Sequence, residues 1–231
     1  MDNFIKQVLS SIWQKTSTER TCSFKEITGH NDIKNILNKA LFSKRPVHIL
    51  FVGKPGSAKT MFLTEIMQQY PKTSYFVVGG NTTKAGLVNQ LFESRPRYLL
   101  IDELDKMNYN DQTALLHLME TGIISETKIR KTRQMNLESW VFATANSCEK
   151  IIGPLVSRFV VLEVPEYTFW EFAEISVTRL SKEGVDERIA RIIAEKVWNE
   201  LDSRDIRDVV KVGRLASNLQ EISFIVGMMK N

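Results

Sequence analysis

The segment GKPGSAKT at residues 53–60 constrains this chain more than any other, because of what surrounds it. The apolar run Val47 to Val52 predicts a buried strand before it, and Met61 to Gln69 predicts a helix after it. A glycine-containing turn between a strand and a helix lets backbone N–H groups close around an anion at the helix N-terminus. The segment therefore predicts a loop that holds the phosphates of a nucleotide.

The side chains of this loop have separate expected tasks. Lys59 would reach the β- and γ-phosphates, and the Thr60 hydroxyl would ligate Mg²⁺. Ala58 stands where the strict motif has glycine, so a left-handed backbone there would cost about 1–2 kcal/mol unless Gly56 supplies the freedom. The predicted nucleotide-binding residues of the loop are Gly53, Pro55, Gly56, Ser57, Ala58, Lys59 and Thr60.

A second motif is the apolar strand Tyr98 to Ile101, which ends in Asp102 and Glu103. Ligands bind at the carboxyl ends of parallel strands, so both carboxylates are expected beside the phosphate loop. Asp102 would hold Mg²⁺, directly or through water, and Glu103 would polarise the attacking water. A solvated helix cap is the alternative for an adjacent Asp–Glu pair, and the phosphate loop upstream disfavours it. The two motifs together predict ATP and Mg²⁺ as the bound cofactors.

The order of hydrophobic patterns predicts the architecture. Short β-branched runs alternate with helix-length segments from residue 47 to 164, which favours a parallel sheet with helices on both faces. From Thr168 to Lys230 every pattern is helical, including one segment from Arg204 to Leu219, and Asp2 to Lys15 has the spacing of an amphipathic helix. We therefore expect an N-terminal helix and linker (1–22), an αβα nucleotide-binding core (23–165) and an all-helical unit (166–231).

The bulk composition narrows the setting without deciding the substrate. The net charge of +4, from 31 basic and 27 acidic residues, permits an acidic partner such as nucleic acid without requiring one. Cys22 and Cys148 lie far apart, and the three histidines have no metal-ligand spacing. Because no apolar run approaches the roughly 20 residues that span a bilayer, we expect a cytoplasmic protein without a membrane partner.

Taken with two further segments, these motifs make the chain resemble the AAA+ ATPases, whose fold is a P-loop NTPase αβα core with a small helical lid. Val141 to Asn146 is similar to the sensor-one strand of that family, which implies that Asn146 orients the attacking water. Pro154 to Phe159 is similar to the arginine-finger segment, which implies that Arg158 reaches the γ-phosphate held by a neighbouring subunit. The resemblance thus implies a homo-oligomeric ring, most simply a hexamer, with its active sites between subunits.

The resemblance assigns two more contacts to the nucleotide. Ser203 to Asp208 is similar to the sensor-two region, which gives Arg207 a phosphate contact in the same subunit, with Arg204 as the competing choice. Both arginines could instead be surface residues paired with nearby aspartates. Ile27 to His30 is similar to the segment that covers the adenine base, so Ile27 and Gly29 are expected near the base.

A segment between Glu103 and Asn146 bears on the substrate. Two strand-like flanks, Leu118 to Ser125 and Asn136 to Trp140, surround a basic stretch that resembles the hairpin before sensor one in minichromosome maintenance helicases, MoxR-type chaperones and the bacterial Holliday-junction branch-migration motor. Cations at such a tip would attract a phosphate backbone independently of sequence. A solvated hairpin end or a protein-docking site remains an equal alternative. The candidate nucleic-acid contacts are Lys128, Arg130, Lys131 and Arg133.

The overall pattern is most similar to the ATPase core of the branch-migration motor. We expect an AAA+ ATPase that hydrolyses ATP with Mg²⁺ at subunit interfaces and acts on DNA as a helicase or branch-migration-like motor. The sequence ends at Asn231, so DNA would be engaged by the hairpin or by a protein adaptor rather than by a winged-helix domain. The alternatives are a MoxR-like remodeller of protein complexes and a slow ATP-dependent assembly switch.

Overall fold

A five-stranded parallel sheet forms the centre of the computed structural model, which describes residues 22–128 and 131–230. The predicted helix at residues 2–15 lies outside the described residues. All four strand pairs are parallel, which confirms the α/β architecture expected from the alternating pattern. The order across the sheet is β2 (Ser74–Val78), β3 (Tyr98–Asp102), β6 (Trp140–Ala145), β1 (His48–Val52) and β7 (Phe159–Glu163).

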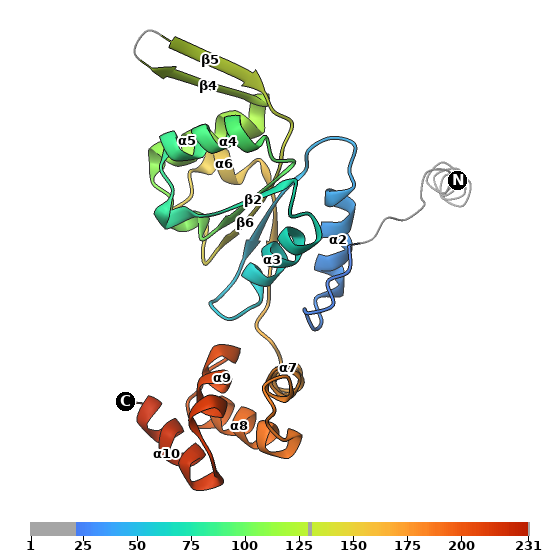
Figure 1. Cartoon of the computed structure of the whole chain (residues 1–231), viewed down its shortest axis with the longest axis vertical. Helices are drawn as coiled ribbons and strands as arrows, with labels where there is room; N and C mark the ends of the chain where they lie inside the picture. The colour runs from blue at the N-terminus through green and yellow to red at the C-terminus, as the bar shows by residue number, and fades with distance from the viewer. Residues whose placement is uncertain (1–21, 129–130, 231) are drawn as a thin grey trace, which may run out of the picture.

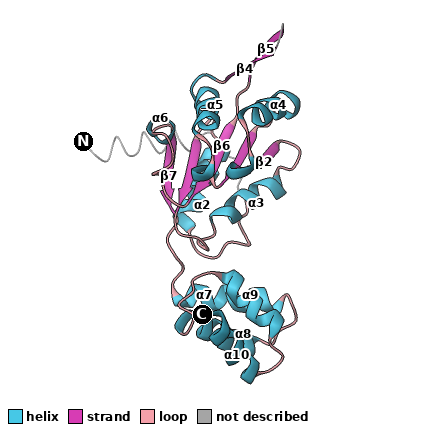
Figure 2. Cartoon of the chain, turned by 90° about the vertical axis from the view of Figure 1, so that its left-hand side faces the viewer, coloured by secondary structure: helices cyan, strands magenta, loops and turns pink. Residues whose placement is uncertain are grey.

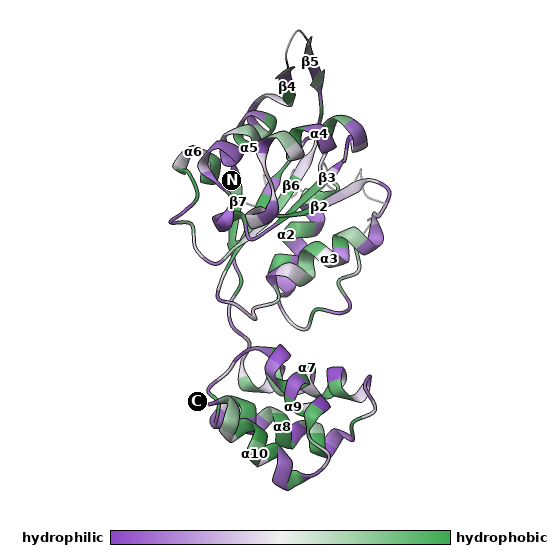
Figure 3. Ribbon diagram, turned by 60° about the vertical axis from the view of Figure 1, so that its left-hand side comes forward, coloured by the Kyte–Doolittle hydropathy of each residue, from purple (hydrophilic) through white to green (hydrophobic). Residues whose placement is uncertain are grey.

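The sheet is covered on both faces, as Figure 1 shows. Successive residues of β1 enter different clusters: Phe51 packs with the residues of α2 (Asn31–Leu41) and α3 (Lys59–Gln69), and Leu50 with those of the opposite face. This alternation follows from the two-residue period of a strand. Figure 3 shows that the central strands are hydrophobic along their length. The opposite face is covered by α4 (Lys84–Ser94), α5 (Tyr109–Thr121) and α6 (Gly153–Val156).

The chain after β7 forms a separate layer of four helices, visible beyond the carboxyl edge of the sheet in Figure 2. The helix predicted from Arg204 to Leu219 is shorter in the structure, because Asp205 caps its start and the chain leaves the helix after Leu215, before Asn218 caps the next one. Among the described residues no helix has both the length and the apolar character needed to cross a membrane. The four helices are α7 (Phe169–Ser181), α8 (Glu187–Asn199), α9 (Ile206–Leu215) and α10 (Leu219–Met229).

These four helices, called the lid below, are joined to the core by side-chain contacts as well as by the chain. Phe172 of α7 belongs to the same buried cluster as Phe62 of α3. Lys182 forms an ion pair with Glu26 at 2.7 Å. These contacts place the lid at the carboxyl edge of the sheet, where the phosphate loop lies.

A two-stranded hairpin projects from the end of the core opposite the lid (Figure 1). Its strands are β4 (Ile123–Lys128) and β5 (Lys131–Asn136), paired antiparallel. The predicted flanks were therefore misplaced: Leu118 lies in α5, and Trp140 begins β6 of the main sheet. The cause is Gly122, whose left-handed backbone (φ 66°) ends α5 and starts the hairpin later than expected.

Candidate nucleotide-binding site

A cleft of about 820 Å³ lies between the phosphate loop, the carboxyl ends of β3 and β6, and the lid. The phosphate loop follows β1, and β1 pairs directly with β6, which in turn pairs with β3. Residues from four segments far apart in the sequence therefore meet at one edge. Residues 55–61 of the loop line the cleft, together with Asp102, Glu103, Thr144 and Asn146 at the strand ends. The remaining lining includes Asp105 and Lys106 after β3, Tyr167 before α7, and Ile175, Asp205 and Arg207 of the lid.

The backbone of the phosphate loop takes the left-handed conformation at two residues, Gly56 (φ 85°) and Ala58 (φ 63°). The sequence left open whether Gly56 would adopt the left-handed conformation in place of Ala58. In the structure both residues adopt it. A Cβ atom on Gly53 would lie 2.4 Å from the carbonyl oxygen of Val164, so that position requires glycine for space. Ala58 is the position where the loop carries backbone strain, and such strain is often found at ligand sites.

Lys59 is buried at the floor of the cleft, with only 7% of its surface exposed. Its ammonium group donates hydrogen bonds of 2.6 Å to the carbonyl oxygens of Gly53 and Lys54. Burial lowers the pKa of Lys59, and the carboxylates of Asp102 and Asp105 act in the opposite direction. A buried cation at the N-terminus of α3 is arranged to attract phosphate.

Asp102 is the centre of a hydrogen-bond network that joins the two motifs. It accepts hydrogen bonds from the Thr60 hydroxyl at 2.9 Å and from the Thr144 hydroxyl at 2.5 Å. The same Thr144 oxygen accepts a hydrogen bond from the backbone N–H of Glu103 at 3.0 Å. Thr144 is buried, and sequence reasoning gave it no role. Its place near the end of a predicted strand, two residues before Asn146, was the available signal in the sequence.

The backbone of Glu103 is also left-handed, with φ 56° and ψ 51°. A Cβ atom on Gly79 would lie 2.3 Å from the Glu103 carbonyl oxygen, so this carbonyl is packed closely against the segment that follows β2. The side chain forms an ion pair with Lys106 at 2.8 Å. Packing and the Thr144 hydrogen bond hold the backbone, while the exposed carboxylate lies at the rim of the cleft.

The donor set suits Mg²⁺ rather than a metal that binds nitrogen or sulfur. Thr60 and Asp102 supply a hydroxyl and a carboxylate oxygen, which are the hard ligands that Mg²⁺ uses together with water and phosphate. One oxygen of Asp105 is buried in this region without a hydrogen-bond partner. Within residues 22–128 and 131–230 no cluster of three or more His, Cys, Asp or Glu side chains could hold a metal by itself.

The two arginines considered for the lid lie in different places. Arg207 lines the cleft, whereas the guanidinium of Arg204 stacks on Trp198 at 3.7 Å and donates to the Trp198 carbonyl oxygen. Asn146 also lines the cleft and is exposed there. The side chains of Asn146 and Arg207 thus line the same cleft as the phosphate loop, and the side chain of Arg204 does not.

Ile27 and Gly29, the residues expected near the adenine base, do not line the cleft in the structure. Ile27 is only 2% exposed and belongs to the main hydrophobic cluster. Thr28 between them lines the cleft, with Tyr167 and Ile175 of the lid side. Gly29 has a φ of 68°, and a Cβ atom there would lie 2.7 Å from a carboxylate oxygen of Glu171, so backbone conformation and this side chain both favour glycine.

Arg158 lies away from the cleft of its own chain. It precedes β7, at the amino edge of the sheet, and pairs with Glu120 at 2.5 Å. Because all five strands are parallel, this edge is opposite the one that carries the phosphate loop. Arg158 cannot contact a phosphate held by Lys59 in the same chain without a large rearrangement.

The hairpin cations are not equivalent. The structure contradicts the expected place of Arg133 at the basic tip: it lies opposite Glu126 within the ladder, forms an ion pair with it at 2.6 Å, and stacks over Phe92 of α4 at 4.2 Å. Lys128 and Lys131 form the last pair before the turn, and their side chains, like Arg130, lie outside the described residues. Arg133 therefore anchors the hairpin on the core.

The comparisons with known proteins agree with this geometry. Residues 49–167 match the model of the "ATPase family associated with various cellular activities (AAA)". The chain belongs to the AAA ATPase family. The matched segment runs from β1, through the phosphate loop and both carboxylates, to the start of the lid. The sequence-based recognition of the family is confirmed.

Relatives and solved structures extend the comparison. The DNA replication licensing factor mcm2 of Xenopus laevis is 27% identical to this chain, and the match covers 78% of this chain and 24% of mcm2. The minichromosome maintenance protein MCM of Saccharolobus solfataricus is 30% identical, and the match covers 52% of this chain and 21% of that protein. The chain thus spans about a quarter of these relatives. The solved structure of the Thermotoga maritima RuvB Holliday junction branch migration motor superposes on this chain with a TM-score of 0.68 and 21% sequence identity. The superposition covers 92% of this chain and 73% of the RuvB chain. This confirms the fold.

Proposed function

We propose that this AAA ATPase binds ATP with Mg²⁺ in the cleft and hydrolyses it there. The observation that carries the proposal is the Asp102 network, in which Thr60 of the phosphate loop, Thr144 of β6 and Glu103 directly after β3 are held together. Lys59 would bind the β- and γ-phosphates, and Thr60 and Asp102 would hold Mg²⁺, which would neutralise charge on the phosphate oxygens. Glu103 would take the proton of the attacking water, and Asn146 would orient that water.

The position of Arg158 supports an oligomer with active sites between subunits. Since Arg158 lies at the sheet edge opposite its own phosphate loop, it can serve a γ-phosphate only in a neighbouring chain. A closed homo-oligomeric ring, most simply a hexamer, gives every cleft one such arginine.

Cys22 and Cys148 are free thiols, which supports a cytoplasmic location.

For the substrate we favour DNA, engaged by the hairpin or through a protein adaptor. The hairpin extends away from the core, and its register brings Lys128 and Lys131 together at the end of the ladder. Paired cations on a projecting element suit a phosphate backbone, which they attract without reading its sequence. The names of the relatives, which include a branch migration motor and replication licensing factors, point the same way.

An ATPase assay with and without single-stranded or branched DNA, with oligomer mass measured in ATP, tests the function. We expect DNA to increase turnover and the combined substitution of Lys128, Arg130 and Lys131 by alanine to remove the increase. Arg133→Ala is the matched control, because that side chain is held by Glu126 and Phe92. Absence of DNA binding at low salt would contradict the DNA substrate. Stimulation by a protein partner alone would favour the remodeller, and negligible turnover of the assembled oligomer would favour the assembly switch.

A further inference from the structure

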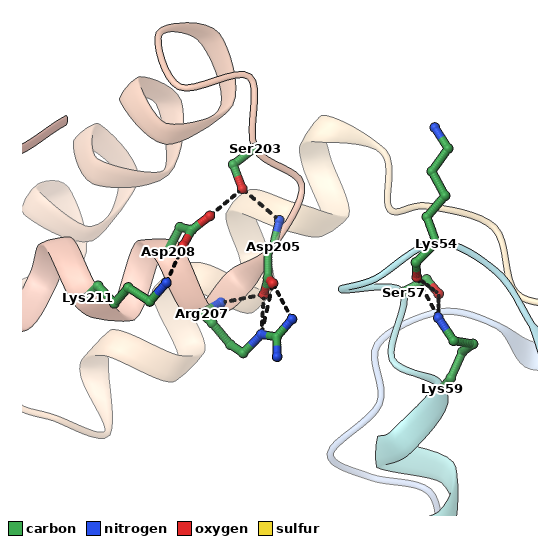
Figure 4. Close-up of polar contacts among 8 residues, drawn as sticks. All are labelled: Lys54, Ser57, Lys59, Ser203, Asp205, Arg207, Asp208 and Lys211. Atoms are coloured by element: carbon green, nitrogen blue, oxygen red, sulfur yellow. Dashed lines mark hydrogen bonds and ion pairs between the residues drawn. The ribbon is translucent and has the colours of Figure 1, made fainter. Parts of the chain in front are cut away.

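In the first turn of α9, Arg207 lines the cleft and its guanidinium is held by the carboxylate of Asp205, the residue that caps the helix. Arg207 donates from Nε to both oxygens of Asp205, at 2.9 and 2.8 Å, and from Nη2 to Oδ2 at 2.5 Å. Figure 4 shows this pair on the side of the lid that faces the phosphate loop with Ser57 and Lys59. The Asp205 side chain is 23% exposed and that of Arg207 is 73% exposed. The carboxylate is therefore the fixed member of the pair, and the guanidinium is the member that a ligand can reach.

Asp205 is itself held from several directions. Its carboxylate accepts the backbone N–H of Arg207, which caps α9, and its own N–H donates to the Ser203 hydroxyl. Ser203 in turn donates to Asp208, which is paired with Lys211 (Figure 4). Burial acts to raise the pKa of Asp205, but the hydrogen bonds and charge of Arg207 outweigh it, so the pKa lies below its usual value. The side chain is thus a fixed, charged acceptor at the start of the helix.

The backbone of Asp205 also packs against the phosphate loop. A Cβ atom built on Gly56 would lie 3.2 Å from the Cα of Asp205 and 3.3 Å from the carbonyl oxygen of Arg204. Gly56 is one of the two left-handed residues of the loop and lines the cleft. One residue of the lid therefore contacts the loop through its backbone and the cleft arginine through its side chain.

We infer that Asp205 is a positioning residue for nucleotide turnover, which it serves by aiming the Arg207 guanidinium at the phosphates. The inference rests on the proposed ATPase function. The double contact from Nε and Nη2 fixes the plane of the guanidinium, as bidentate pairs do, and leaves Nη1 for a phosphate oxygen. The packing of Asp205 on Gly56 ties this direction to the position of the phosphate loop. A change in the loop on nucleotide binding would then move the arginine with it.

Asp205→Asn separates positioning from helix capping, because asparagine caps a helix N-terminus as well as aspartate does but cannot hold a guanidinium by charge. We expect its kcat for ATP hydrolysis to fall between about tenfold and 100-fold, as for other small displacements of a reacting group, with a smaller change in KM. Circular dichroism and Tm should stay near those of the intact protein. Asp186→Asn, at the N-cap of α8 and outside the cleft lining, is the matched control and should keep kcat.

The deciding measurement is a double-mutant cycle on kcat with Arg207→Ala. If Asp205 acts through Arg207, adding Asp205→Asn to Arg207→Ala causes no further loss. Losses that multiply, or an Asp205→Asn or Arg207→Ala variant with the kcat of the intact protein, would overturn the inference while leaving the ATPase function in place. An intact protein that neither binds nor hydrolyses ATP would overturn the proposed function and this inference with it.

Discussion

In the nucleotide cleft, polar side chains from distant segments hold one another through short hydrogen bonds, whereas the hairpin is a two-stranded element with its own small sheet. Asp102 alone joins three segments of the core, and the backbone beside it is left-handed at both Ala58 and Glu103. The hairpin contacts α4 and α5 of the core, with Arg133 as the anchor on α4. The polar network of the cleft therefore depends on the tertiary fold, while the hairpin forms mainly by local pairing between two neighbouring strands.

The largest effect in this comparison is expected from Lys59→Ala. Loss of the buried cation should lower kcat/KM for ATP by at least about 100-fold, because one fixed group that stabilises transition-state charge is worth that much. Lys54→Ala is the matched control in the same loop, since Lys54 points to Glu166 and does not line the cleft. Equal losses in both variants, measured by steady-state ATPase assays, would mean that the loop is only a folding element.

Thr144→Val should have the next largest effect. Valine keeps the shape of threonine but leaves one Asp102 oxygen and the Glu103 N–H without this partner, which costs about 1–3 kcal/mol of unfolding free energy. We also expect Mg²⁺-dependent turnover to fall by about tenfold, the kinetic equivalent of 1.4 kcal/mol. Thr144→Ser keeps the hydroxyl and should remain close to the intact protein in denaturant titrations and kinetics. A Val variant that matches the Ser variant would remove Thr144 from the site.

Ala58→Gly should stabilise the protein. Glycine adopts φ 63° without the roughly 1–2 kcal/mol cost to an L side chain, and part of that gain is offset by the greater freedom of the unfolded chain. We expect a rise in Tm of about 2–4 °C by calorimetry, the size that about 1 kcal/mol produces in a chain of this length. Arg95→Gly, at φ 45° after α4, is a matched position outside the cleft. A fall in Tm for Ala58→Gly alone would contradict the loop conformation described here.

The smallest effect is expected from Arg133→Ala, on the hairpin side of the comparison. The half-exposed ion pair with Glu126 and the stacking on Phe92 each contribute about 1 kcal/mol or less, so the free energy of unfolding should fall only slightly. The salt dependence of DNA binding should stay the same, whereas Lys128→Ala should reduce its logarithmic slope by about 0.7 for single strands. Fluorescence anisotropy over a salt series measures both. A larger loss of slope for Arg133 would place its guanidinium on DNA instead of on the core.

The same difference explains what the sequence could predict. Lys59 and Asp102 lie at the ends of strands in a predicted parallel sheet, and such ends share one edge, so their convergence in one cleft was predictable. Asn146 was assigned from the resemblance to the AAA+ family. Thr144 was not assigned, because its role depends on β6 lying directly beside β3, which the sequence does not state. Arg133 was misplaced for a similar reason: its partner Phe92 lies on α4, 41 residues away in the sequence. The start of the hairpin was also misplaced, because it is set by the left-handed backbone of Gly122, which the hydrophobic pattern does not reveal.

The most direct test of the central claim, that Glu103 acts on water in a cleft formed by the Asp102 network, compares ATP binding and ATP turnover in Glu103→Gln. The amide keeps the size of the side chain and removes its basicity. The account predicts that the ATP dissociation constant, measured by calorimetry with Mg²⁺, stays within about threefold of the intact protein, while kcat falls by at least about 100-fold, the usual contribution of a general base. Turnover equal to that of the intact protein would contradict it.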